Sequence, residues 1–346
     1  MATFPLLFDL GRSPTTRDVA KLVRDGGLAA LPDARRRGDA ATYQEIRCRS
    51  ALNRVKGMPF FKWTLNPYRG CTHGCHYCFA RKYQTQLELN AGDDFASVIF
   101  VKTNFVDVLR RELAKPTWVK DTIGFGTATD PYQPIEGTYK LSRGVLEALR
   151  DAASPVGIVT KGPMIVRDLD VLQDLSKRAP CRIHISVPTV DEEAWEQLEP
   201  GVAHPMQRLR AVRQLVDAGL DCGVLMAPIV PGFSTQPSKI ERTIKAIADS
   251  GARSVGAMVM HLQGGTRDHF MGLLAREYPH LVDRYEHLYA GKYARKDYLR
   301  QVDEVVGMMR ARYLPSVRKR AVAASALRAS TFAKATADRS AGQALD

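Results

Sequence analysis

The sequence lacks any apolar run of about 18 residues, the length that a membrane-spanning helix requires. It also lacks an Ala-x-Ala cleavage pattern behind a long apolar stretch near its start, so we expect no secretory signal peptide. No short-period repeat is visible, which argues against a repeat architecture. We therefore expect a cytoplasmic protein that makes no membrane contact.

Cysteine is scarce, and its distribution is uneven. The 346 residues include six cysteines, of which three cluster at Cys71, Cys75 and Cys78. The other three are scattered, at Cys48, Cys181 and Cys222. A cluster of three leaves one thiol unpaired, so we expect no disulfide framework, and the pattern suits a reducing compartment.

Acidic residues are fewer than basic ones. Fifty Lys and Arg accompany 37 Asp and Glu, which gives a net charge of +13. Part of this surplus lies in residues 317–346, where six basic and two acidic side chains occur with few large apolar ones, so we expect a disordered basic tail. A basic surface favours contact with nucleic acid or another polyanion.

The clustered cysteines form a Cys-x3-Cys-x2-Cys motif, the most informative feature of the chain. Three thiolates on one tight loop can hold three irons of a cubane [4Fe-4S] cluster and leave the fourth iron open to a small molecule. Electron-transfer clusters usually have four cysteine ligands, so three ligands indicate chemistry at the open iron. Gly70 and Gly74 let the backbone bend around such a group. A helix predicted over 79–89 would direct its positive end toward Cys78 and favour the thiolate.

Spacing alone leaves two other interpretations of these cysteines open. A structural zinc site needs four ligands, and His73 or His76 would supply the fourth, in a non-catalytic zinc- or iron–sulfur-containing binding protein. An electron carrier would need a fourth ligand for the last iron, and Cys48 is the nearest spare thiol.

Strand and helix patterns alternate along the central part of the chain. Apolar strand patterns occur at 61–66, 98–103, 122–127, 156–160, 182–187, 223–229 and 254–260. Helical patterns follow them at 105–113, 141–151, 166–177, 206–218 and 239–249. Repeated β-then-α units require parallel strands joined by right-handed crossovers. We therefore predict an α/β fold, a partial (β/α)6-type barrel, with six or seven strands depending on whether 98–103 joins it.

The same patterns divide the chain into four parts. Residues 1–55 are predicted to form an N-terminal extension, 56–265 the barrel core, 266–316 a set of C-terminal helices, and 317–346 the basic tail. In barrels of this kind the functional residues lie at the C-terminal ends of the strands. The cysteine loop follows the first strand and polar candidates follow later ones, so one common site is expected.

The cysteine motif, with Tyr77 just before its last cysteine, resembles the signature of the radical S-adenosylmethionine (radical SAM) superfamily. The segment Gly126-Thr127-Ala128-Thr129-Asp130-Pro131-Tyr132-Gln133-Pro134-Ile135-Glu136 resembles the spore photoproduct lyase-like branch. Shorter matches follow in the expected order, at Thr160-Lys161, Arg167-Asp168, His184-Ile185-Ser186, Glu199-Pro200 and 227–232. The resemblance covers residues 45–265 of the sequence, roughly the predicted barrel.

The resemblance implies a [4Fe-4S] cluster on the three cysteines and S-adenosyl-L-methionine at the open iron. An electron then splits the sulfonium, and a 5′-deoxyadenosyl radical takes hydrogen from a substrate. Implied cofactor-binding residues are Tyr77, Thr127, Thr129, Asp130, Lys161, Ser186 and Ala227. The two threonines and the aspartate would hold the amino group, the lysine an anion, the serine the ribose or carboxylate, and the alanine the adenine. A reducing electron donor of flavodoxin or ferredoxin type is also implied.

The lyase of this branch repairs a thymine dimer in DNA and is thought to use a cysteine as hydrogen donor. That cysteine falls at the Thr127 position, where this chain has no thiol. The resemblance therefore implies the radical machinery, in an enzyme of lyase or oxidoreductase type, more strongly than it implies the lyase's substrate. Nucleic acid is the leading candidate substrate, a peptide or small metabolite is the alternative, and no catalytic side chain is assigned.

Overall fold

The computed structural model describes residues 41–87 and 90–314. The predicted basic tail, and most of the predicted N-terminal extension, lie outside these residues. None of the helices in the described part combines the length and the apolar character that a bilayer crossing would need.

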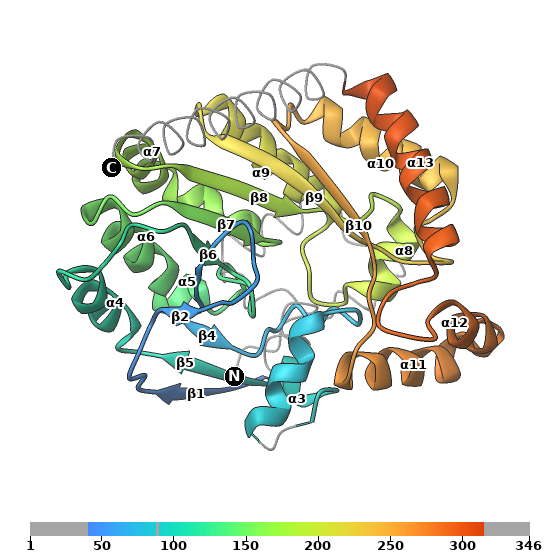
Figure 1. Cartoon of the computed structure of the whole chain (residues 1–346), viewed down its shortest axis with the longest axis horizontal. Helices are drawn as coiled ribbons and strands as arrows, with labels where there is room; N and C mark the ends of the chain where they lie inside the picture. Colours follow the sequence, from blue (N-terminus) through green and yellow to red (C-terminus); the bar gives the residue numbers. More distant parts are fainter. Residues whose placement is uncertain (1–40, 88–89, 315–346) are drawn as a thin grey trace, which may run out of the picture.

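The core is an open, curved sheet (Figure 1). In sheet order its strands are β10 (Val255–Val259), β9 (Asp221–Ile229), β8 (Cys181–Ser186), β7 (Val156–Thr160), β6 (Ile123–Phe125), β3 (Trp63–Leu65) and β2 (Asn53–Arg54). Six of them run parallel, and β2 pairs antiparallel with β3 at the edge. The predicted partial six-stranded barrel is therefore confirmed.

The possible seventh barrel strand belongs to a different sheet. It is β5 (Val98–Lys102), which pairs parallel with β1 (Thr42–Ile46) and antiparallel with β4 (Tyr68–Arg69). Burial alternates along β5, whereas every residue of β6 is buried. A parallel barrel strand is covered on both faces, and a strand with one covered face suits a small surface layer.

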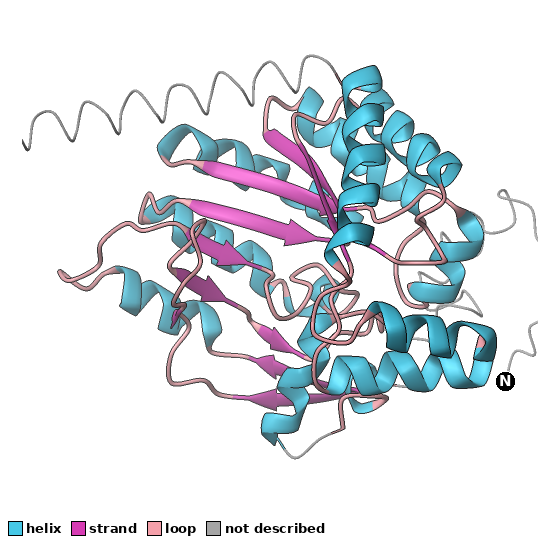
Figure 2. Cartoon of the chain, turned by 45° about the vertical axis from the view of Figure 1, so that its right-hand side comes forward, coloured by secondary structure: helices cyan, strands magenta, loops and turns pink. Residues whose placement is uncertain are grey.

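Helices cover the convex face of the large sheet (Figures 1 and 2). The predicted crossover helices are α4 (Phe105–Leu113), α6 (Leu141–Asp151), η3 (Pro163–Asp168) with α7 (Leu169–Arg178), α9 (Pro205–Asp217) and α10 (Pro237–Asp249). Each buries one apolar stripe, as Val145, Leu146 and Leu149 show in α6. The sequence patterns did not reveal the short helices α3 (Asp94–Ser97), α5 (Glu136–Tyr139) and α8 (Glu192–Leu198).

In the described part of the chain, four helical segments follow the last barrel strand, β10. They are α11 (Gly265–Glu277), η4 (Pro279–Leu281), α12 (Val282–Leu288) and α13 (Lys296–Tyr313), and α13 packs against α10. Helix α11 lies against η2 (Phe79–Leu87), the helix that follows the cysteines. There Thr266 Oγ1 donates to the carbonyl of Cys78 (2.9 Å), and a ring nitrogen of His269 lies 2.9 Å from one of His76. The C-terminal helices thus support the cysteine loop directly.

Candidate active site

The cysteine loop begins where β3 ends, at the C-terminal side of the barrel. Gly70 has a positive φ of 80°, and a Cβ there would lie 2.5 Å from the carbonyl oxygen of Val98. Only glycine fits this close approach of the loop to β5. The next amide, that of Cys71, donates to the carbonyl of Phe95 (2.9 Å), which fixes the first cysteine in place.

A second loop, at residues 198–201, braces the cysteines from the other side. The amide of His76 donates to Leu198 O (3.0 Å), and the amide of Gly201 donates to His73 O (3.0 Å). A Cβ at Gly201 would lie 2.2 Å from Thr72 O, so the two backbones are in direct contact. The Glu199-Pro200 motif seen in the sequence therefore belongs to the support of the cysteine loop.

Behind the loop, Arg81 fills the space between the cysteines and α3. Its guanidinium donates to the carbonyls of Gly74 (2.6 Å) and Cys75 (3.0 Å), and to those of Ala91 and Gly92. The side chain is buried, with 2% of its surface exposed. Arg69, which precedes the loop, donates to the carbonyl of Tyr83.

The helix after Cys78 is a 3-10 helix, and the pKa values of the thiols do not follow the expected dipole effect. Burial raises the pKa of Cys71 and Cys78 above the usual value, and it raises the pKa of Cys75 to about 12. Binding of a metal group must therefore displace protons from these sulfurs.

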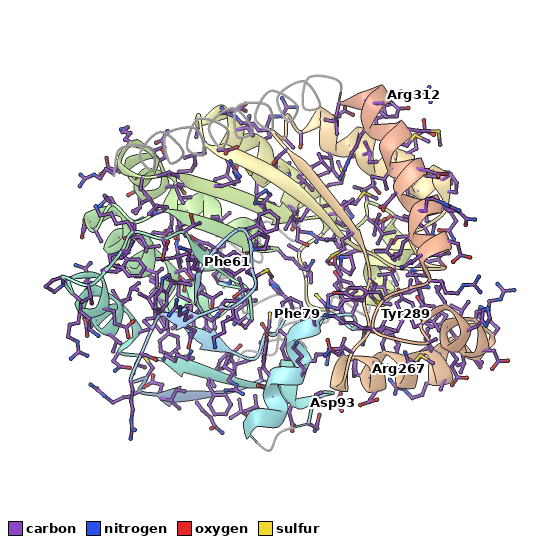
Figure 3. The ribbon with its side chains drawn as sticks, in the orientation of Figure 1. Phe61, Phe79, Asp93, Arg267, Tyr289 and Arg312 are labelled. Carbon is purple, nitrogen blue, oxygen red and sulfur yellow. The ribbon has the colours of Figure 1, made fainter. Side chains whose placement is uncertain are left out.

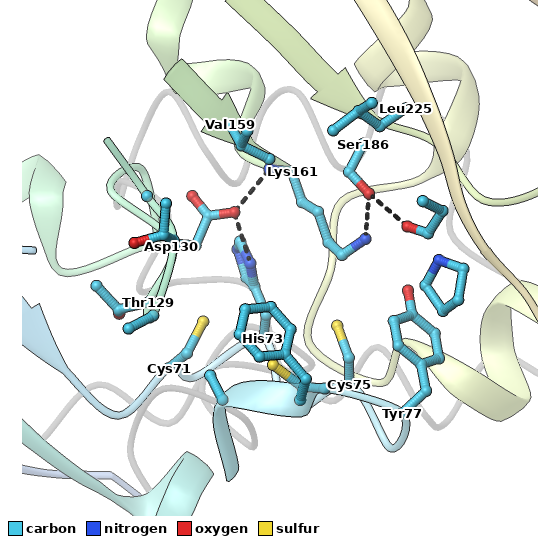
Figure 4. Close-up of a pocket in the computed structure, with 18 of the residues that line it drawn as sticks. Cys71, His73, Cys75, Tyr77, Thr129, Asp130, Val159, Lys161, Ser186 and Leu225 are labelled. Carbon is cyan, nitrogen blue, oxygen red and sulfur yellow. Dashed lines mark hydrogen bonds and ion pairs between the residues drawn. The ribbon is translucent and has the colours of Figure 1, made fainter. Parts of the chain in front are cut away.

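All of the predicted metal and cofactor residues line a single pocket of about 340 Å³. They are Cys71, Cys75, Cys78, Tyr77, Thr127, Thr129, Asp130, Lys161, Ser186 and Ala227. The volume lies in the range of small-molecule sites. The strand ends thus bring together residues that are more than 150 positions apart in the sequence (Figure 4).

Lys161 lies at the centre of a polar network on one wall of the pocket (Figure 4). Its Nζ donates to Ser186 Oγ (2.6 Å) and lies 3.0 Å from Glu199 Oε1. Glu199 also accepts from Tyr77 OH and pairs with Arg208, whose Nη2 lies 2.5 Å from Oε2. Lys161 and Arg208 carry two positive charges and Glu199 carries one negative charge. This wall of the pocket therefore has a surplus positive charge, which suits an anionic ligand group.

Glu199 and Arg208 are fully covered partners within this network. Their side chains are 2% and 0% exposed. Burial opposes the charged form of Glu199, but Arg208 and Lys161 more than offset it and hold the pKa of that carboxyl at about 2. The sequence matched Glu199 only as part of a motif and gave no sign of Arg208.

Asp130 and Thr129 border the pocket from the opposite wall, and both are bonded to the protein. Asp130 accepts from Thr160 Oγ1 (2.5 Å) and from the amide of Lys161 (2.6 Å), and it pairs with His73 (3.4 Å). Burial opposes ionisation of Asp130, but His73 and the hydrogen bonds lower its pKa overall. Thr129 Oγ1 donates to the carbonyl of Gly70 (2.6 Å).

Several residues of the matching motifs lie away from the pocket. Glu136 accepts from Tyr68 OH (2.5 Å) and pairs with Arg167 (2.8 Å), while Asp168 accepts from Tyr132 OH (3.0 Å). This buried network joins α5 to η3 and has a structural role. The spare thiols are also remote. The amide of Cys48 donates to Asn104 Oδ1 (2.8 Å), just before α4, and Cys181 and Cys222 lie at the N-terminal ends of their strands.

The three cysteine side chains face the pocket as separate ligands. Among residues 41–87 and 90–314, no three His, Cys, Asp or Glu side chains converge as they would around one metal ion. A cubane cluster gives each thiolate its own iron, so three thiols that line one pocket are a donor set that fits such a cluster.

Comparisons with known proteins agree with this geometry. A family model described as the radical SAM superfamily matches residues 65–237. An uncharacterized protein of Mycobacterium tuberculosis is 39% identical over 279 residues, which cover 80% of this chain and 82% of that protein. A radical SAM Nalpha-GlyT isomerase of Pseudomonas phage M6 is 26% identical over 172 residues, which cover 49% of this chain and 33% of the phage protein.

A solved structure adds a likeness in fold. A spore photoproduct lyase variant with bound AdoMet and dinucleoside spore photoproduct superposes with a TM-score of 0.61 at 16% identity. The alignment covers 82% of this chain and 83% of that one.

Proposed function

This chain belongs to the radical SAM superfamily, and from that premise we propose that it is a radical SAM enzyme acting on an external substrate. When bound, the [4Fe-4S] cluster and S-adenosyl-L-methionine would supply a 5′-deoxyadenosyl radical that abstracts hydrogen. Cys71, Cys75 and Cys78 would hold the cluster. A flavodoxin- or ferredoxin-like protein would deliver the electron.

Individual side chains have distinct parts in this proposal. Lys161, which pairs with Glu199, and Ser186, which accepts from Lys161, would bind the cofactor carboxylate, because their wall carries surplus positive charge. Thr127, on the opposite wall, would accept a hydrogen bond from the amino group. Ala227 accepts a hydrogen bond from Ser186 Oγ through its carbonyl and is followed by Pro228. Its small side chain would leave room for the flat adenine.

One observation carries the proposal: three thiols and an anion-binding lysine share one pocket. The test is anaerobic reconstitution with iron and sulfide, followed by reduction in the presence of S-adenosyl-L-methionine. We expect about four irons per chain, an electron paramagnetic resonance (EPR) signal that changes when the cofactor is added, and 5′-deoxyadenosine as product. Cys71→Ala should remove the cofactor-dependent signal and the product. Zinc in place of iron, or a cluster that ignores the cofactor, would refute the proposal.

For the substrate, we propose nucleic acid, supported by the rim of the pocket. The loop at residues 55–62, between β2 and β3, carries Met58 and Phe60, and Phe60 is 76% exposed. Phe61 of that loop packs on Gly124 of β6 and borders the pocket together with Phe79 (Figure 3). Exposed aromatic rings stack on bases, and Lys56 and Lys62 of this loop would contact phosphates.

Oligonucleotide binding tests this choice of substrate. We expect a single-stranded oligonucleotide to bind with an affinity that falls as salt rises. Phe60→Ala should weaken binding by about five- to 150-fold, the range for losing one base–aromatic stack. Met308→Ala, which removes another exposed apolar side chain (61%) from α13, should leave binding unchanged. If wild type, Phe60→Ala and Met308→Ala bind the oligonucleotide equally, the search for the substrate moves to peptides and small metabolites. Transfer of deuterium from a candidate compound into 5′-deoxyadenosine would then identify the substrate.

A further inference from the structure

Arg81 is a buried cation directly behind the cysteine loop, and its hydrogen bonds are unusual. All four of its hydrogen bonds go to backbone carbonyls, two of them in the loop itself, at Gly74 and Cys75. The guanidinium also lies 5.0 Å from the ring centre of Phe95. These contacts satisfy the donors of Arg81, but they leave its charge in place.

No carboxylate lies within 4.0 Å of the Arg81 guanidinium among the residues that the structure describes. The other buried arginine of the described residues, Arg208, has such a partner in Glu199. A buried charge without a partner is costly, so a native protein normally supplies a counter-charge. The groups whose negative charge acts most strongly on Arg81 are the three cysteines of the loop, and Asp93 follows them without forming an ion pair.

We propose that Arg81 is the fixed counter-cation of the iron–sulfur cluster and sets its reduction potential. This inference rests on the proposed function, since it requires a cluster on the three cysteines. Reduction adds one electron from an external donor, with no proton or bond transferred, and so adds one negative charge to the loop. A positive charge held behind the loop, away from water, stabilises that added charge and raises the potential.

Arg81 is therefore a positioning and tuning residue, and its hydrogen bonds must be separated from its charge. Arg81→Gln removes the charge and keeps hydrogen-bond donors. Arg81→Lys keeps the charge and loses the forked geometry. Lys82→Gln is the matched control, because it removes a positive charge at the next position of the chain, where the side chain is less buried than that of Arg81. The potential of each reconstituted protein is measured by EPR-monitored titration with dithionite, without S-adenosyl-L-methionine.

We expect Arg81→Gln to lower the equilibrium constant for one-electron reduction at least tenfold, which corresponds to about 59 mV toward more negative potential. Arg81→Lys should shift it by less than half as much, and Lys82→Gln by less than threefold. Equal shifts in both Arg81 variants, or none in either, would overturn the proposal. If Arg81→Gln alone fails to retain iron, the charge is needed for the cluster to bind, as proposed. If both Arg81 variants lose iron alike, the hydrogen bonds are what matter, and the proposal fails.

The two proposals fail in different ways. A wild-type protein that takes up no four-iron cluster refutes the proposed function before any variant is made. A wild-type protein that cleaves S-adenosyl-L-methionine, with a potential unaffected by Arg81→Gln, leaves that function standing and removes only the role of Arg81.

Discussion

Truncation of Glu199 should destabilise the protein more than any surface mutation. Glu199→Ala removes the carboxylate that pairs with Arg208, accepts from Tyr77 and lies 3.0 Å from Lys161. Arg208 would then remain in the interior, 0% exposed, and its remaining polar contact with the described residues would be a hydrogen bond to the carbonyl of Ser186 (2.8 Å). Breaking a buried ion pair by removing one partner costs about 3–5 kcal/mol.

The measurement is anaerobic urea unfolding of wild type and variant, reconstituted in parallel and followed by circular dichroism. Glu304→Ala is the control, because its pair with Arg300 is mostly exposed (67% and 75%) and is worth about 0–1 kcal/mol. A loss below about 1 kcal/mol for Glu199→Ala would show that the pair is not the support inferred from its burial.

The same carboxylate gives a pH dependence with a definite sign. The pKa of Glu199 is about 2 in the folded protein, below its ordinary value of 4.5. Its contribution to stability is therefore complete above pH 4.5 and is lost as the pH falls toward 2. Wild type should lose stability over this interval more steeply than Glu199→Gln. Parallel curves for the two proteins would contradict the assignment.

Three further variants test other parts of the site. Lys161→Met should keep the cluster but weaken S-adenosyl-L-methionine binding at least tenfold in calorimetry, because it removes the cation at the anion site; unchanged affinity would place the carboxylate elsewhere. Gly201→Ala should lower iron content after reconstitution, since its Cβ would lie 2.2 Å from Thr72 O, and full iron content would show that the two loops move apart freely. Cys48→Ser should leave the iron content and EPR signal unchanged, whereas an altered signal would revive the four-ligand carrier.

The repeated helices and barrel strands could be predicted because their signals are local. Apolar residues at helical spacing predicted the first and last residues of α4 and α6 correctly, because one face of each helix is buried. The assignment of β5 could not be settled, because a short apolar strand looks the same in either sheet. Its partner β1, with the polar sequence Thr-Tyr-Gln-Glu-Ile, carries no strand signal that identifies the pairing.

The residues that line the pocket could be predicted from the geometry of a parallel sheet. The side chains that hold those residues in place could not. Parallel strands place their C-terminal ends on one side, so Lys161 and Ser186 were expected near the cysteines before any contact was known. Arg81 and Arg208 act through contacts with backbone carbonyls and with a distant glutamate. Such contacts leave no periodic trace in a sequence. Gly201 offered the one readable hint, a glycine directly after the matched Glu199-Pro200 pair.

The contacts around the cysteine loop also bear on when metal can be inserted during the life of the polypeptide. The thiols occur early in the chain, but their supports arrive late: Gly201 reaches His73, and Thr266 reaches Cys78. A ribosome delivers the N-terminal part first. The loop therefore emerges long before these supports exist, so we expect the proposed iron loading to follow synthesis of the whole chain.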